Sequence, residues 1–233
     1  MTTFAELNAT LIACRRCPRL VEWREKVASE KRRAYQDWEY WGKPVPGFGD
    51  PAGRVLVIGL APGAHGSNRT GRNFTGDSSG DFLYPALYRA GFANQPHASH
   101  RNDGLSLQDM YITASCRCAP PENKPTPAEL ANCRPYLAQE ISLLNRVQVI
   151  VALGKIAFDS VLQYYQSTSH KAGPAPILAP STLIFAHGAQ YLLGPDRPRL
   201  VASYHPSRQN TQTGRLTAAM FDEIWSQVKS LLC

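Results

Sequence analysis

The sequence predicts an α/β protein in which helices cover both faces of a parallel β-sheet, giving a three-layer α/β/α sandwich. Two observations indicate this class. Short apolar runs without alternation occur at 55–61, 110–115, 147–154 and 199–206, as in strands that are buried on both faces. A segment with helical spacing follows each run, and this alternation is typical of α/β sandwiches.

The first element in the chain is a basic N-terminal lobe, residues 1–50. It contains Cys14-Arg15-Arg16-Cys17 and then a helix expected over 21–41, before prolines and glycines between 44 and 49 break the chain. We expect the lobe to pack on the sandwich, so that residues 1–233 form a single domain.

The later elements follow the apolar runs. Helices are expected near 80–91, from Thr126 onward, at 155–165 and at 216–232, with a possible short strand at 182–188. The pattern Thr126-Pro127-Ala128-Glu129 is typical of a helix N-terminus, because the threonine and glutamate side chains can cap the first turn.

Composition restricts the class of partner. The net charge of +7 comes from 25 Lys and Arg against 18 Asp and Glu. This balance favours a polyanionic partner, although a soluble basic enzyme without such a partner has the same signature. No window approaches the ~18 apolar residues of a membrane span, and the N-terminus lacks a signal-peptide pattern. We therefore expect a cytoplasmic protein that does not bind membranes.

Three unusual segments should meet at one edge of the sheet. In open parallel sheets, ligands bind beyond the carboxyl ends of the strands. The glycine-rich loop 59–80 follows the first strand, a Pro-Pro turn follows the second, and Tyr204-His205-Pro206 follows the last. The loop matches neither the dinucleotide nor the P-loop fingerprint. Its only acid, Asp77, is either a helix N-cap or a functional carboxylate.

The cysteines indicate a metal site. Cys14 and Cys17 form C-x-x-C, and Cys118 and Cys133 lie about a hundred residues further on. The four thiolates can meet only if the lobe folds back on the sheet. Their spacing fits zinc or an iron–sulfur cluster equally, and buried cysteines without a metal are a third possibility. We expect Cys116 to be spare and Cys233 to be a free terminal thiol.

Three motifs carry a resemblance to a known family. GLAPGAHGSNRTGRNFTGD, YITASCRCAPPENKPTP and SYHPSRQNTQTGRLT, in this order, resemble the signatures of the uracil-DNA glycosylase superfamily, and within it the iron–sulfur branch called type B or family 5. The resemblance implies a four-stranded parallel sheet, with the N-terminal helical lobe tied on by a [4Fe-4S] cluster on Cys14, Cys17, Cys118 and Cys133. It also implies a monofunctional hydrolase that flips uracil, and other deaminated bases, out of DNA and initiates base excision repair.

The resemblance also assigns roles to residues. Asp77 would orient or deprotonate the attacking water, and His205 would donate a hydrogen bond to the leaving base. The remaining expected substrate contacts are stacking by Phe74, a polar contact from Asn123, backbone lining at Ala61 and Gly63, and phosphate contacts from Arg69, Arg72, Arg208 and Arg215. The structural cluster would also help to place Arg15 and Arg16 near DNA.

The chain departs from the sister branch at two positions. Leu60 stands where that branch has a carboxylate, and Ala114 stands where many relatives have an asparagine that holds uracil. Both differences are typical of the type B branch, and they imply a less selective pocket in which Asp77 is the remaining acid.

The expected partners are duplex DNA with a deaminated base and single-stranded DNA, bound by a monomer in the cytoplasm of a prokaryotic cell, at the nucleoid. Two alternatives remain open. A non-catalytic iron–sulfur nucleic-acid-binding or redox module would explain the charge and the cysteines. A zinc protein is a third interpretation.

Overall fold

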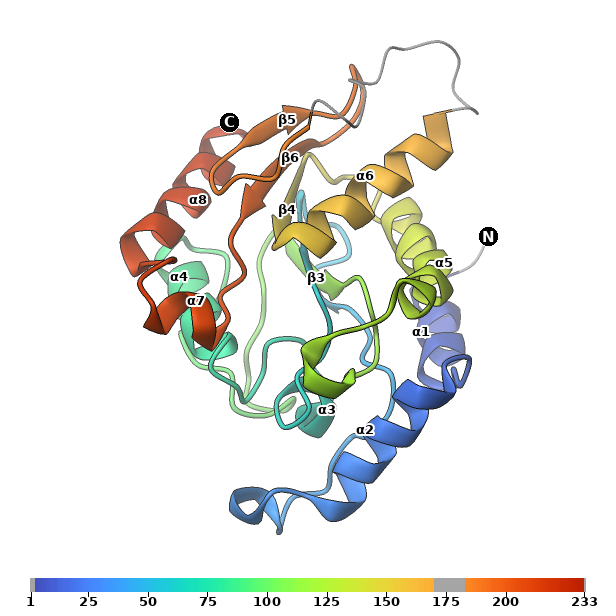
Figure 1. The fold of residues 1–233 in the computed structure, drawn as a ribbon. Helices are drawn as coiled ribbons and strands as arrows, with labels where there is room; N and C mark the ends of the chain where they lie inside the picture. Colours follow the sequence, from blue (N-terminus) through green and yellow to red (C-terminus); the bar gives the residue numbers. More distant parts are fainter. Residues whose placement is uncertain (1–2, 170–182, 233) are drawn as a thin grey trace.

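The computed structural model describes residues 3–169 and 183–232 (Figure 1). Within them, one six-stranded sheet has the order β1-β3-β2-β4-β6-β5. Its four central strands are parallel, as expected: β3 (Met110–Ala114), β2 (Val55–Gly59), β4 (Val149–Leu153) and β6 (Arg199–Ser203). The first three are buried along their whole length, which explains their continuous apolar sequence.

Two short antiparallel strands extend the expected four-stranded sheet at its edges. β1 (Phe48–Gly49) pairs with β3, and β5 (Gln190–Leu192) pairs with β6. The strand expected at 182–188 is therefore displaced to β5, because residues 183–188 form loop and turn; Thr182 lies outside the described residues.

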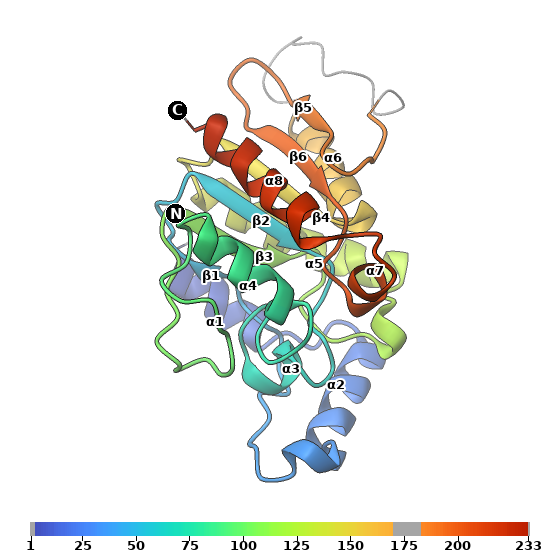
Figure 2. The ribbon, with the colours of Figure 1, turned by 90° about the vertical axis from the view of Figure 1, so that its left-hand side faces the viewer.

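Helices cover both faces of the sheet (Figure 2). α4 (Gly80–Arg89) and α8 (Ala218–Ser230) pack on the face that carries Val55 and Val57. α5 (Pro127–Leu143) and α6 (Lys155–Ser169) pack on the face that carries Leu56 and Ile58. The three-layer α/β/α sandwich is thus confirmed. Thr126 and Glu129 form the expected capping box at the start of α5.

The N-terminal lobe differs from the expectation in its helices. α1 (Phe4–Ile12) precedes the C-x-x-C pair and packs against α5. α2 (Pro18–Glu30) ends well before residue 41, because Lys31 has a positive φ of 53°, which breaks the helix. A single 3-10 turn, η1 (Arg33–Tyr35), follows.

The remaining short elements lie at the carboxyl edge of the parallel strands. They are α3 (Ser67–Thr70) in the glycine-rich loop, η2 (Pro121–Asn123) after β3, and α7 (Arg208–Gln212) after β6. Figure 1 shows α3 and α7 at this edge, with α2 of the lobe near α3. None of the helices among the described residues is long and apolar enough to span a bilayer.

Candidate active site and cysteine pocket

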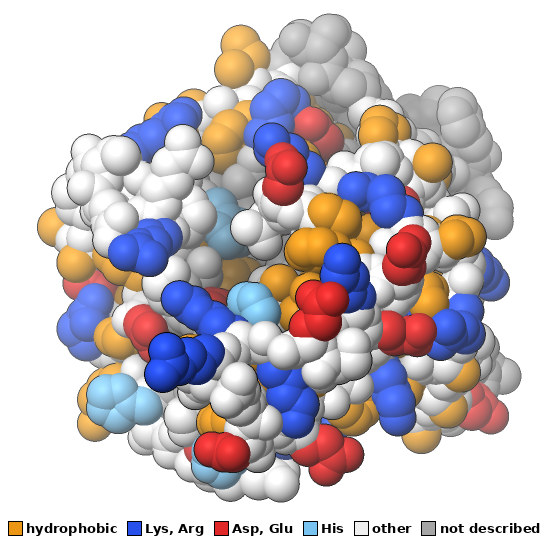
Figure 3. Space-filling view, turned by 60° about the horizontal axis from the view of Figure 1, so that its bottom comes forward, with side chains coloured by type: hydrophobic (Ala, Val, Ile, Leu, Met, Phe, Trp, Pro, Cys, Tyr) orange, Lys and Arg blue, Asp and Glu red, His pale blue; other side chains and the backbone are white. Residues whose placement is uncertain are grey.

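A cleft of about 840 Å³ opens at the carboxyl edge of the sheet. Figure 3 shows the hollow in this face, with histidine, lysine and arginine side chains around it. Segments after β2, β3 and β6 contribute to its walls, as the topology predicted. Seven of the ten expected catalytic and substrate-binding residues line it: Ala61, Gly63, Phe74, Asp77, Asn123, His205 and Arg208.

Asp77 combines the two roles that the sequence left open. Its Oδ1 accepts hydrogen bonds from the backbone N–H groups of Ser79 and Gly80, each at 3.1 Å, at the start of α4. Its Oδ2 accepts no hydrogen bond within the described part of the chain. Burial raises the pKa of this carboxyl, and the two backbone bonds work in the opposite direction. Capping therefore fixes the carboxylate, and Oδ2 is left for chemistry in the cleft.

Two glycines of the loop make room for this carboxylate. A Cβ added to Gly63 would lie 3.1 Å from Asp77 Oδ2. A Cβ added to Gly66 would overlap Oδ2 and would lie 2.6 Å from Asp77 Cγ. Because real Cβ atoms essentially never approach within 3.0 Å, only glycine at position 66 permits the observed position of Asp77.

Phe74 and His205 form an aromatic pair in the cleft. Their ring centroids are 5.8 Å apart, with the planes at 34°. Phe74 has a positive φ of 53°. Its Cζ would lie 2.7 Å from a Cβ added to Gly59, so the ring can pack at the end of β2 only because residue 59 has no side chain. Burial lowers the pKa of His205 to about 4, which keeps the imidazole neutral near pH 7. A neutral imidazole has one N–H to donate.

The polar contact expected from Asn123 has a suitable position. The side chain is exposed in η2, where Glu122 and Asn123 both have positive φ, and it lines the cleft. Leu60 and Ala114 also line the cleft. Leu60 and Ala114, which replace the expected carboxylate and asparagine of related branches, therefore face the same cleft as Asn123.

Arg69 and Arg72 do not line the cleft. Arg69 is 3% exposed, and its guanidinium lies against the rings of Tyr35 and Trp38, with Cζ at 3.9 and 4.0 Å from their centroids. Arg72 is 4% exposed and forms an ion pair of 2.7 Å with Asp103. This burial is evidence against the phosphate contacts expected of both residues. The sequence showed their charge, but the partners come from distant segments.

Arg208 and Arg215 remain available to solvent. Arg208 is exposed at the first position of α7 and lines the cleft. Arg215 is exposed with its guanidinium 4.7 Å from the centroid of the Tyr204 ring. Among the cleft residues that the sequence did not single out are Arg32, Tyr35, His65 and Lys124. For Arg32 and Tyr35, the basic and aromatic composition of the N-terminal lobe was the only indication in the sequence of a role at the site.

Comparison with known proteins identifies the family. A model described as the uracil DNA glycosylase superfamily matches residues 46–229. The chain belongs to this superfamily. It is 54% identical to a type-5 uracil-DNA glycosylase of Thermus thermophilus over 95% of both chains. It is 51% identical to one of Mycobacterium leprae over 97% of this chain and 94% of the relative. A type-4 enzyme of Pyrobaculum aerophilum is 32% identical over 58% of this chain and 61% of the relative, so the type-5 resemblance is confirmed.

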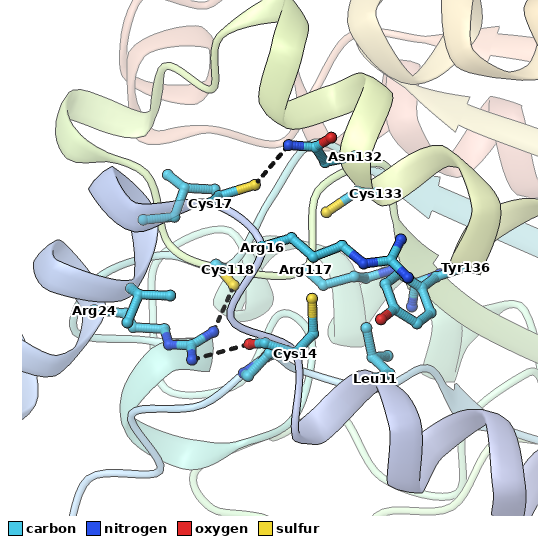
Figure 4. Close-up of a pocket in the computed structure, with 13 residues that line it drawn as sticks. Leu11, Cys14, Arg16, Cys17, Arg24, Arg117, Cys118, Asn132, Cys133 and Tyr136 are labelled. Carbon is cyan, nitrogen blue, oxygen red and sulfur yellow. Dashed lines mark hydrogen bonds between the residues drawn. The ribbon is translucent and has the colours of Figure 1, made fainter.

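The four predicted cysteine ligands of this superfamily member line one small pocket between the lobe and α5 (Figure 4). The lobe therefore folds back on the sandwich, as the metal hypothesis required. Cys116 is fully buried nearby, donates to the carbonyl of Cys118 at 3.6 Å, and does not line the pocket. Cys233 lies outside the described residues. In the described ranges, no group of three or more His, Cys, Asp and Glu side chains is arranged to hold a metal ion.

A buried cation lies beside these sulfurs. Arg24 is 2% exposed; its Nη1 donates to Cys118 Sγ at 2.8 Å and its Nη2 to the Cys14 carbonyl at 3.2 Å. Its Nε has no partner in the described structure, and Glu25, its nearest carboxylate, is 3.9 Å away and half-exposed. A buried cation without a close counter-charge costs several kcal/mol. The pocket therefore suits an occupant that carries negative charge.

The second buried arginine at the pocket is already neutralised. Arg117 pairs with Glu140, which also accepts from the Thr113 hydroxyl at 2.7 Å. The two arginines expected near DNA have partners in the protein: Arg15 pairs with Glu25, and the guanidinium of Arg16 lies 5.4 Å from the centroid of the Tyr136 ring at the cysteine pocket. Arg24 is thus the buried cation at the pocket whose carboxylate partner is distant and half-exposed, whereas that of Arg117 is close and buried.

Proposed function

We propose that this protein is a monofunctional DNA glycosylase that removes uracil from DNA by hydrolysing the N-glycosidic bond. The observation that carries the proposal is the carboxylate of Asp77, fixed by the start of α4 and by Gly66 with Oδ2 unpaired at the cleft. The type-5 uracil-DNA glycosylases, 44–54% identical over most of the chain, support it.

The cleft suits a base that has left the DNA stack. A volume of about 840 Å³ is within the range of small-molecule sites, and aromatic stacking on Phe74 would contribute ~1–3 kcal/mol. Leu60 and Ala114 offer no side-chain hydrogen bond to the base. Selection by shape and by Asn123 would then admit other deaminated bases beside uracil.

Cleavage of the N-glycosidic bond is promoted by stabilising the charge that develops on the sugar and on the leaving base. Positive charge develops on the sugar, and Asp77 Oδ2 stabilises it while orienting the attacking water and accepting its proton. Negative charge develops on the leaving base, and the neutral His205 imidazole donates a hydrogen bond to it. A well-placed donor of this kind lowers the barrier by about 3 kcal/mol.

Strand cleavage after base removal requires an amine nucleophile, and the cleft offers a poor one. Lys124 is the single lysine among the described residues that line the cleft. Its side chain is exposed, and its Nζ donates to Glu122 at 3.1 Å. It lacks the desolvation that activates lysine amines. An abasic site is therefore the expected product.

We further propose that Cys14, Cys17, Cys118 and Cys133 hold a [4Fe-4S] cluster. Four thiols at one pocket are a suitable donor set, and a cluster spreads its thiolates because each binds a different iron. The negative charge of a thiolate-bound cluster would neutralise Arg24. The cluster would be structural, joining the lobe to the turn that carries Asn123. Duplex and single-stranded DNA as substrates, a monomeric state, and a location in the cytoplasm at the nucleoid complete the proposal.

The proposal is tested with purified protein in EDTA and end-labelled duplexes that carry one U·G, U·A or hypoxanthine·T pair. Hot alkali converts abasic sites into breaks, and a parallel sample omits the alkali. Breaks only after alkali, lost in Asp77→Asn, are expected. A brown protein that binds the duplex without producing breaks would instead be the non-catalytic module, and a colourless protein containing zinc would contradict the cluster.

A further inference from the structure

The lobe contributes a second wall to the cleft, apart from α7. Residues 31–38, here called the lobe wall, place Arg32 and Tyr35 in the cleft lining. Figures 1 and 2 show this segment beyond α3, at the far end of α2 from the cysteines and away from α7. A molecule that fills the cleft would therefore meet cations from two separate segments, Arg32 and Arg208.

Arg69 holds the lobe wall against the glycine-rich loop. Its guanidinium lies against the rings of Tyr35 and Trp38, which are themselves packed edge to face, and such cation–π contacts help to fix both rings. The same side chain donates from Nε to the His65 carbonyl at 2.7 Å and from Nη2 to the Gly76 carbonyl at 2.9 Å. One arginine thus joins the lobe wall to both ends of the turn that positions the site.

The backbone strengthens this attachment. The N–H of Trp41 donates to the Arg69 carbonyl at 2.9 Å, and the N–H of Gly42 donates to the Asn68 carbonyl at 3.0 Å. Inside the lobe wall, Lys31 Nζ donates to the Gln36 carbonyl at 3.0 Å. The backbone of the segment is therefore attached to the glycine-rich loop.

Arg32 carries a charge available to a ligand. The side chain is exposed and forms no ion pair within the described residues. It is close enough to His65, another cleft residue, to help lower the pKa of that imidazole, for which burial is the larger cause. A phosphate at this place would meet an unneutralised guanidinium.

We propose that Arg32 binds a backbone phosphate of the DNA strand on the lobe side of the flipped nucleotide, and that Arg69 is the positioning residue that holds the lobe wall in place. The inference rests on the proposed function. It replaces the direct phosphate contact expected of Arg69 with an indirect one, because this side chain is buried and its guanidinium contacts Tyr35, Trp38 and two backbone carbonyls.

Salt dependence of binding tests the contact at Arg32. The probe is a labelled duplex with a tetrahydrofuran abasic-site analogue, and log Kobs is plotted against log salt concentration. Each phosphate contact contributes about 0.9 to the slope, so Arg32→Gln is expected to make it shallower by about 0.9. The matched control is Arg33→Gln, the adjacent exposed arginine that does not line the cleft, which is expected to keep the wild-type slope.

Arg69→Lys distinguishes an anchor from a contact. Lysine keeps the charge but lacks the planar guanidinium that contacts both rings and donates to the His65 and Gly76 carbonyls from two nitrogens. If Arg69 is an anchor, Arg69→Lys should show the same shallower salt slope as Arg32→Gln. Its circular dichroism spectrum should remain native. Retention of the wild-type slope in Arg69→Lys, or in Arg32→Gln, overturns the inference. Uracil excision by the wild type is measured in parallel: its absence contradicts the proposed function, whereas excision with an unchanged Arg32→Gln slope contradicts this inference alone.

Discussion

Gly66→Ala tests whether the position of Asp77 controls the reaction. The added methyl would lie 2.6 Å from Asp77 Cγ and 2.7 Å from its Cβ, and it would overlap Oδ2. Ordinary van der Waals contact begins at 3.4 Å, so the carboxylate must move by roughly 0.8 Å or more. Because Oδ1 is held by two backbone donors, this movement also breaks the capping geometry.

The expected effect is large. A displacement of about 1 Å from the productive geometry costs about 10²-fold in rate, equivalent to about 2.7 kcal/mol of barrier. Gly63→Ala is the graded comparison: its Cβ would lie 3.1 Å from Oδ2, which a shift of a few tenths of an ångström relieves. We expect a loss of less than about tenfold for this variant.

Single-turnover excision of uracil from a U·G duplex, with enzyme in excess, is the assay. The overlap with Asp77 can also destabilise the fold, so thermal unfolding is measured as well. Gly91→Ala is the control, because Gly91 has φ of 78° and nothing within 4 Å of an added Cβ. It should lose stability and keep its rate. A folded Gly66→Ala protein with the wild-type rate would refute the positioning of Asp77 by the loop.

Asp77→Asn should abolish excision and raise the melting temperature near pH 7. Burial raises the pKa of the Asp77 carboxyl in the native state above its ordinary 3.8. The native state therefore loses stability as pH rises from 3.8 through this raised pKa, and the neutral amide removes that cost. A lower melting temperature contradicts this. Because the pKa of His205 is about 4, the pH profile of excision should contain no His205 step between about pH 6 and 8, and His205→Gln should be about 10²-fold slower across that range. Arg24→Met should lose iron and brown colour to EDTA faster than wild type, whereas Arg134→Met on α5, bonded to Gln163 at 2.7 Å, should not; equal retention by both variants contradicts the charge argument. Glu140→Ala should lower the free energy of unfolding by about 3–5 kcal/mol, measured with urea, because it leaves Arg117 buried and unpaired; a loss below about 1 kcal/mol contradicts this.

Periodicity and chain order were sufficient to predict the sandwich and the edge where the site lies. The apolar runs at β2, β3 and β4 are fully buried, and the segments that follow β2 and β3 bring Asp77 and Asn123 to the cleft. The edge strands β1 and β5 were not predicted as such, since two or three residues carry no periodic signal. The end of α2 was also missed, because a positive φ at a lysine has no sequence signature.

The arginines show the limit of reasoning from motifs. Arg69 and Arg72 lie in the same loop as Asp77, and their charge suggested DNA. Their partners Tyr35, Trp38 and Asp103 come from segments about thirty residues away, which sequence spacing does not bring together. Conversely, the buried cation Arg24 is one of many arginines in the sequence, and only its position beside Cys118 distinguishes it.

The packing of the glycine-rich loop also bears on how this enzyme can change its specificity during evolution. Seven polar or charged residues of the loop are buried, among them Asn68, whose amide donates to the Arg24 carbonyl at 3.2 Å. A substitution here perturbs the interior and the cysteine pocket together, so most would be removed by selection for folding. Leu60, Ala114 and Asn123 line the cleft outside that network. New base preferences should therefore arise at these three positions first, and libraries for directed evolution are best concentrated there.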